Sequence, residues 1–247
     1  MAVDPADTLI ASARVLLGDA TARESQFIEA TAASRTIPSD FVFKAAVKYF
    51  EGATLLQQAW QLIGNDAIKK KESVAKNAEL YSKQSEGLKQ KHSKTVMRSY
   101  RIPDNSTGYD FAGIFGDCID AQLTSVVVED PYIVENYQVL LFINLCELLV
   151  TSAQNLKHIT LVTSEKAKFE NFENLRTSLS ERGITLIVTK NSTIHDREVL
   201  FDNGWIVKIG RGLNIYKPTK PFTLGAGNQA FRPCRETNVE VLKLVLK

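Results

Sequence analysis

The stretch His195-Asp196-Arg197-Glu198-Val199-Leu200-Phe201-Asp202-Asn203-Gly204-Trp205-Ile206-Val207-Lys208-Ile209-Gly210-Arg211-Gly212 decides how the second half of this chain folds. Two apolar runs flank Asn203-Gly204, and an Asn-Gly pair between such runs is a strong hairpin signal. Because side chains alternate along a strand, His195 and Arg197 are expected to face the same side and to reach one phosphate group. Asp202, just before the turn, is expected to orient its neighbours or to cap the turn.

The elements around this hairpin predict an α/β domain. Apolar, β-branched runs alternate with amphipathic helical patterns, which favours a parallel or mixed sheet with helices on its faces. Strands are expected at 124–128, 158–163, 185–189, 197–201, 205–209 and 237–246, and helices at 135–152 and 165–182.

The first hundred residues predict helices only. Apolar residues recur at helical spacing over 8–33, 41–63 and 67–93, with breaks at residues 37–40 and 64–66. Three helices with two short connections suggest a small antiparallel bundle. We therefore expect a multidomain chain: an all-α three-helix bundle over residues 1–92, a linker over 93–108 and the α/β domain over 109–247.

Basic residues are unevenly distributed, although the formal net charge is only +2. Residues 203–235 contain six basic and no acidic residues. The ordinary explanation of such a run is a solvated basic surface. The more specific explanation is a surface that binds an anionic membrane. The basic run that begins at Lys69 lacks aromatic interleaving beyond Tyr81, so a nucleic-acid partner is not expected. The candidate residues for binding phosphate or lipid are His195, Arg197, Lys208, Arg211, Lys217 and Lys220.

Cysteine usage and hydropathy exclude other classes of protein. Cys118, Cys146 and Cys234 form no paired spacing, so we expect no disulfide framework, no metal site and no cofactor. The longest apolar run, at 139–150, is too short to span a bilayer, and no signal peptide is visible. These observations predict a cytoplasmic protein whose contact with membranes is peripheral.

His195, Arg197 and Asp202 together resemble the His-Lys-Asp signature of the phospholipase D superfamily, with Arg197 in place of the lysine. That signature occurs twice in an active site, because one histidine attacks phosphorus while the other protonates the leaving oxygen. His92 and His158 supply no second copy, so we expect no enzymatic activity from one chain. A homodimer that pairs two His195 residues, as a phosphodiesterase or nuclease, remains open.

Three separated segments, at 127–133, 194–213 and 231–237, closely resemble the phospholipase-D-like domain of the MIT-domain-containing protein 1 family. Segments 43–56 and 78–89 are similar to the second and third helices of a microtubule-interacting-and-transport (MIT) domain. The resemblance implies an adaptor whose bundle binds C-terminal tails of ESCRT-III subunits. Its second domain would bind acidic phospholipids, including phosphoinositides, with recruitment to endosomes or to the midbody in late cytokinesis.

The same resemblance implies a partner-binding groove between the second and third helices, where an amphipathic helix would lie. The groove would run past Leu55, Ala59, Ala78, Tyr81 and Leu88. The alternative is that these residues form the core of the bundle.

Overall fold

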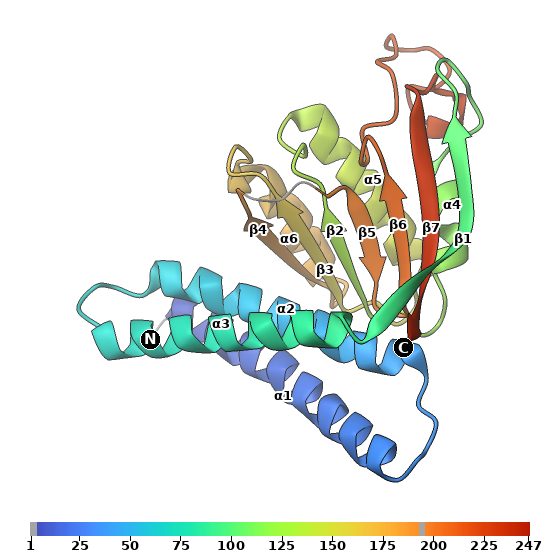
Figure 1. The fold of residues 1–247 in the computed structure, drawn as a ribbon. Coiled ribbons are helices and arrows are strands. Elements are labelled where there is room, and N and C mark those ends of the chain that lie inside the picture. The colour runs from blue at the N-terminus through green and yellow to red at the C-terminus, as the bar shows by residue number, and fades with distance from the viewer. Residues whose placement is uncertain (1–3, 193–195) are drawn as a thin grey trace. The chain divides into compact units, whose positions relative to one another are not determined.

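The computed structural model describes residues 4–192 and 196–247, and the chain divides into two compact units (Figure 1). The first unit extends to Ser93 and includes Leu244–Lys247, and the second is Lys94–Lys243. Within the described ranges, no helix has the length and apolar character needed to cross a membrane.

The first unit contains the three expected helices, α1 (Pro5–Ala32), α2 (Ser39–Leu62) and α3 (Ile68–Lys89). Asp4 caps α1, because its carboxylate accepts the Ala6 N–H at 2.9 Å. Tyr49 of α2 joins all three helices. Its hydroxyl donates to Glu24 of α1 at 2.8 Å, and its ring stacks on Tyr81 of α3 with centroids 5.7 Å apart.

In the described part of the second half, the strands form one seven-stranded mixed sheet with the order β1-β7-β6-β5-β2-β3-β4. The pairs β2–β3 and β3–β4 are parallel, whereas β2–β5, β5–β6 and β6–β7 are antiparallel. The structure therefore confirms a mixed sheet that follows three helices. The bounds are β1 (His92–Ile102), β2 (Ser125–Glu129), β3 (His158–Thr163), β4 (Thr185–Lys190), β5 (Glu198–Phe201), β6 (Trp205–Ile209) and β7 (Thr237–Leu246).

Helices α4 (Phe111–Phe115), α5 (Asn136–Ser152) and α6 (Glu173–Ser180) accompany the sheet and lie behind it in Figure 1. Because β-α-β connections between parallel strands are right-handed almost without exception, β2-α5-β3 and β3-α6-β4 place α5 and α6 on the same face. The core lies between this face and the helices. It is built around fully buried aromatic rings, including Phe115, Phe142, Phe172 and Phe201.

Two segments differ from the sequence-based expectation. Residues 93–108, expected to be a linker, contain most of β1. This strand has one neighbour, β7, and is largely exposed, so it shows no apolar alternation that would reveal it. The helix expected at 165–182 is shorter, because a turn and a 3₁₀ helix at Phe169–Phe172 bury Ala167 and Phe172 before α6 begins.

Candidate functional site

The carboxyl ends of β2 and β6 and the amino end of β5 meet at one edge of the sheet. The antiparallel registers place Glu198 opposite both Glu129 of β2 and Lys208 of β6. Arg197 directly precedes β5, and its carbonyl accepts the Ile209 N–H at 3.1 Å. The hairpin therefore brings Arg197 and Lys208 to the same edge.

The Arg197 guanidinium is engaged by groups of the protein itself. Its centre lies 4.1 Å from the centroid of the Tyr132 ring, a cation–π arrangement. It also donates to the carbonyl oxygen of Gly210. These contacts fix the guanidinium over the loop that follows β2.

Asp130 is a buried carboxylate at this edge and holds two loops together. Its Oδ2 accepts the Leu213 N–H and its Oδ1 accepts the Tyr132 N–H, each at 3.0 Å. Burial raises the pKa of Asp130, against the lowering effect of these two N–H groups and of the charge on Arg197. Gly212, with φ of +60°, packs so closely on this carboxylate that a Cβ there would overlap it.

Three further carboxylates gather at the same edge as Arg197. Carboxylate oxygens of Glu129, Asp196 and Glu198 lie within 4.8 Å of one another. Such oxygens suit a hard cation, but Lys208 already pairs with Glu198 at 3.2 Å. Partial burial alone would lower the pKa of Lys208, yet the charge of Glu198 and the hydrogen bond to it raise that pKa overall.

The described residues beside Arg197 enclose little space. The cavity lined by Asp130, Arg197 and Glu198 measures about 10 Å³, roughly the space of a single water molecule. Arg211, which follows β6, directs its Nε to the carbonyl of Glu236 at 3.1 Å. His195 lies outside the described residues.

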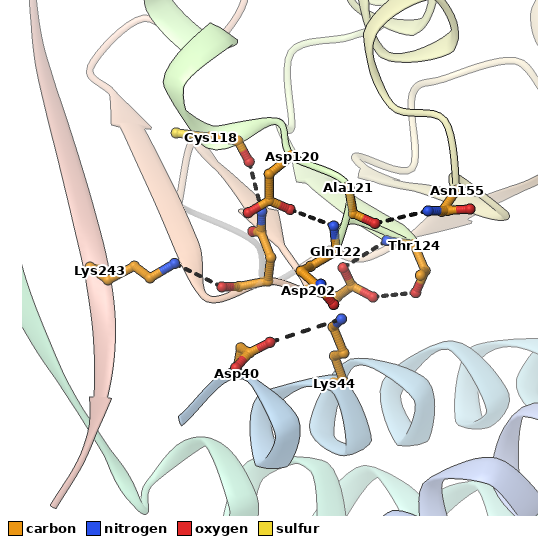
Figure 2. A network of polar contacts seen from close by, with 11 residues as sticks. Asp40, Lys44, Cys118, Asp120, Ala121, Gln122, Thr124, Asn155, Asp202 and Lys243 are labelled. Atoms are coloured by element: carbon orange, nitrogen blue, oxygen red, sulfur yellow. Dashed lines mark hydrogen bonds and ion pairs between the residues drawn. The ribbon is translucent and has the colours of Figure 1, made fainter. Parts of the chain in front are cut away.

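Asp202 lies at the opposite end of β5 from Arg197, and Figure 2 shows its surroundings. Its carboxylate accepts the backbone N–H of Thr124 at 3.0 Å and the Thr124 hydroxyl at 2.5 Å. The side chain is buried, with 1% of the residue exposed. Strand β5, which separates Asp202 from Arg197, is four residues long, or about 13 Å at 3.3 Å per residue. Asp202 therefore anchors the start of β2.

Lys217 belongs to a different place from Arg197 and Lys208. With Arg232 and Arg235 it lines a recess of about 700 Å³, whose lining also includes Tyr137, Leu140 and Asn144 of α5. Lys220 is exposed three positions after Lys217 and does not line this recess. We call this hollow the cationic recess. Within the described residues, its lining includes no acidic side chain.

The cations of the recess differ in how their charge is balanced. Lys217 pairs with Asp104 at 2.7 Å and thereby lowers the pKa of that carboxyl. The Arg232 guanidinium donates instead to the carbonyls of Gly225 and Ala226, at 2.5 and 3.0 Å. Arg235 donates to the Asn214 side chain at 3.0 Å and to the Tyr216 carbonyl. No carboxylate of the described residues pairs with either guanidinium, which favours an anionic ligand.

The helical unit has a groove of about 470 Å³ between α2 and α3. Of the five residues expected along it, Ala78 lines it, whereas Leu55, Ala59 and Leu88 are buried in the core and Tyr81 stacks on Tyr49. The remaining groove residues are Gln57, Trp60, Gln61, Ala75, Glu79 and Ser82.

Sequence reasoning missed these groove residues and also Arg232 and Arg235. Trp60 offered a signal, because an aromatic residue on the polar side of an amphipathic helix is unusual. Here Trp60 is 42% exposed, with the Lys71 ammonium 4.7 Å from its ring centroid. For Arg232 and Arg235 the signal was the absence of acidic residues from 203 to 235.

Comparison with known proteins finds a matching family and a similar relative. Residues 108–243 match the family described as the phospholipase D-like domain at the C-terminus of MIT. The chain is also 32% identical to MIT domain-containing protein 1 of Mus musculus over 210 aligned residues. The alignment covers 80% of this chain and 84% of the mouse protein. The matched family segment contains both the edge around Arg197 and the cationic recess.

Proposed function

Because the chain belongs to the MIT domain-containing protein 1 family, with a phospholipase D-like domain in its C-terminal part, we propose that it is an adaptor. In this proposal the helical unit is an MIT bundle that binds C-terminal tails of ESCRT-III subunits. The C-terminal unit binds acidic phospholipids, including phosphoinositides, without cleaving them. The adaptor would act in the cytoplasm, at the membrane surface of endosomes or of the midbody during late cytokinesis.

The groove between α2 and α3 is the observation that carries this proposal. Its floor includes the small side chains Ala75 and Ala78, which let another helix approach closely. Trp60 also lines the groove, and its large apolar side chain is exposed to solvent. Small residues beside an exposed aromatic side chain suit an amphipathic helix that lays its apolar face into the groove.

The cationic recess supports the lipid-binding half of the proposal. Arg232 and Arg235 carry charge that only neutral oxygens contact, and Lys220 lies exposed on the segment between Lys217 and Arg232. Each basic residue near an acidic leaflet contributes about 1 kcal/mol, so these residues together would give useful and reversible binding.

The arrangement around Arg197 supports binding without turnover. A phosphodiester must reach the attacking histidine and the cations that neutralise its oxygens. Here Arg197 is held by Tyr132 and Gly210, and the cavity that it lines with Asp130 measures only about 10 Å³. We therefore place the lipid headgroup at the cationic recess rather than beside Arg197.

Replacing Ala75 with arginine is expected to weaken binding of an ESCRT-III tail peptide to the full-length protein about 10-fold or more. Ala75 is exposed on α3, so the longer side chain would fill the groove without disturbing the core. Fluorescence anisotropy with a labelled peptide measures the affinity. Ala11→Arg, at an exposed position of α1, is the matched control and should bind like the wild type. Equal affinity for Ala75→Arg and Ala11→Arg would contradict the groove assignment.

A further inference from the structure

The segment between β6 and β7 exposes large apolar side chains at its tip. Phe222 is fully exposed, and Leu224 is 79% exposed. In Figure 1 this orange segment reaches beyond the ends of the strands that it connects. Single exposed apolar residues are ordinary, but two within three positions of a projecting tip expose a concentrated apolar surface to water. Phe222 also has φ of +61°, a left-handed conformation that is unfavourable for a bulky residue.

Hydrogen bonds hold the base of this segment in place, so they also fix the position from which the tip projects. The Lys217 N–H donates to the Pro233 carbonyl at 2.8 Å, and the Arg235 N–H donates to the Ile215 carbonyl at 2.7 Å. Arg232 reaches across to the carbonyls of Gly225 and Ala226. Gly225 is buried with φ of +88°, and a Cβ there would lie 3.1 Å from Arg232, so the turn requires glycine.

Cations lie on both sides of the apolar tip along the chain. Lys220 is two positions before Phe222, and Arg232 and Arg235 return from the tip to β7. Both arginines face the cationic recess, where no acidic residue of the described chain lies in the lining. In an anionic bilayer the acyl chains lie below a surface of phosphates. An apolar tip suits the acyl chains, and cations at its base suit the phosphates.

We propose that residues 218–228 form a membrane-insertion loop, in which Phe222 and Leu224 enter the acyl region of an anionic bilayer while Lys220, Arg232 and Arg235 contact headgroup phosphates. This inference rests on the proposed lipid binding of the C-terminal unit and specifies its mode. A bilayer fits better than a folded protein partner, because a lipid surface accepts a narrow wedge. A protein interface buries a broader and more complementary face.

Vesicle co-sedimentation of the full-length protein tests the loop. Wild type should sediment with phosphatidylcholine vesicles that contain phosphatidylserine and stay in solution with phosphatidylcholine alone. Phe222→Ser/Leu224→Ser should weaken the apparent affinity about 10-fold or more, because the transfer of two large apolar side chains is lost. Val96→Ser/Met97→Ser is the matched control, since both residues are more than half exposed on β1 of the same unit.

A tryptophan at the tip distinguishes insertion from surface attraction. The emission of Phe222→Trp, after subtraction of the wild-type signal, should shift to shorter wavelength on anionic vesicles and be quenched by brominated acyl chains. A soluble inositol phosphate should produce neither change. The same blue shift with inositol phosphate alone would overturn insertion in favour of a soluble ligand.

The outcomes separate the two proposals. If wild type fails to sediment with anionic vesicles, the proposed lipid binding fails and the inference fails with it. If wild type sediments, and the Phe222→Ser/Leu224→Ser variant sediments equally well without quenching at position 222, only the insertion loop is overturned.

Discussion

Replacing Gly212 with alanine is expected to lower the free energy of unfolding of the C-terminal unit by about 3 kcal/mol or more. Two effects add at this position. The φ of +60° is a left-handed conformation that costs a non-glycine residue about 1–2 kcal/mol. The new Cβ would also overlap the Asp130 carboxylate and push it away from the Leu213 N–H that it accepts.

Thermal and urea unfolding followed by circular dichroism would measure this loss. Gly227→Ala is the control, because a Cβ at that position meets nothing within 4 Å and its φ lies outside the left-handed region. We expect Gly227→Ala to remain within about 0.5 kcal/mol of the wild type. Equal stabilities for Gly212→Ala and Gly227→Ala would show that Asp130 does not hold this turn.

Replacing Asp202 with alanine is expected to cost the C-terminal unit about 2–4 kcal/mol of unfolding free energy. The carboxylate is buried and accepts both the N–H and the hydroxyl of Thr124 (Figure 2). Without it, the partly buried Thr124 N–H at the start of β2 loses its partner. The aspartate of the signature would then contribute to folding rather than to phosphate chemistry.

Asp120→Ala is the matched comparison for Asp202→Ala. Asp120 is exposed, and its carboxylate accepts the Gln122 N–H at 2.8 Å, so we expect a cost below about 1 kcal/mol. A double-mutant cycle of Asp202→Ala with Thr124→Ala, followed by urea unfolding, isolates the side-chain pair. Additive effects in the cycle would contradict the role assigned to Asp202.

The sequence predicts the elements that are buried, because burial requires a recognisable pattern of apolar residues. Strands β2, β3 and β4 are buried runs, and the Asn203-Gly204 pair places the β5–β6 turn correctly. β1 escapes prediction, because an exposed edge strand has almost no apolar pattern. The short helix α4 escapes for another reason: Asp110 caps it by accepting the Gly113 N–H, and five residues are too few to show helical periodicity.

The candidate site was harder to predict than the fold. The Asn203-Gly204 pair predicts the hairpin on which Arg197 and Lys208 lie, but it does not show that Glu129 and Asp130 arrive at the same edge from β2. A linear run also groups Lys208 with Lys217, although the latter belongs to the cationic recess with Arg232. Helical spacing marks Leu55 and Leu88 as apolar, but core and groove residues share that spacing.

Co-recruitment of a labelled ESCRT-III tail peptide to anionic vesicles by the full-length protein tests the adaptor account most directly. The account predicts that the peptide sediments only when the protein and acidic vesicles are both present. It also predicts that either Ala75→Arg or Phe222→Ser/Leu224→Ser strongly reduces the sedimented peptide, and that no headgroup is released. Protein that binds peptide or vesicles, but never both together, would contradict the account, as would headgroup release that depends on His195.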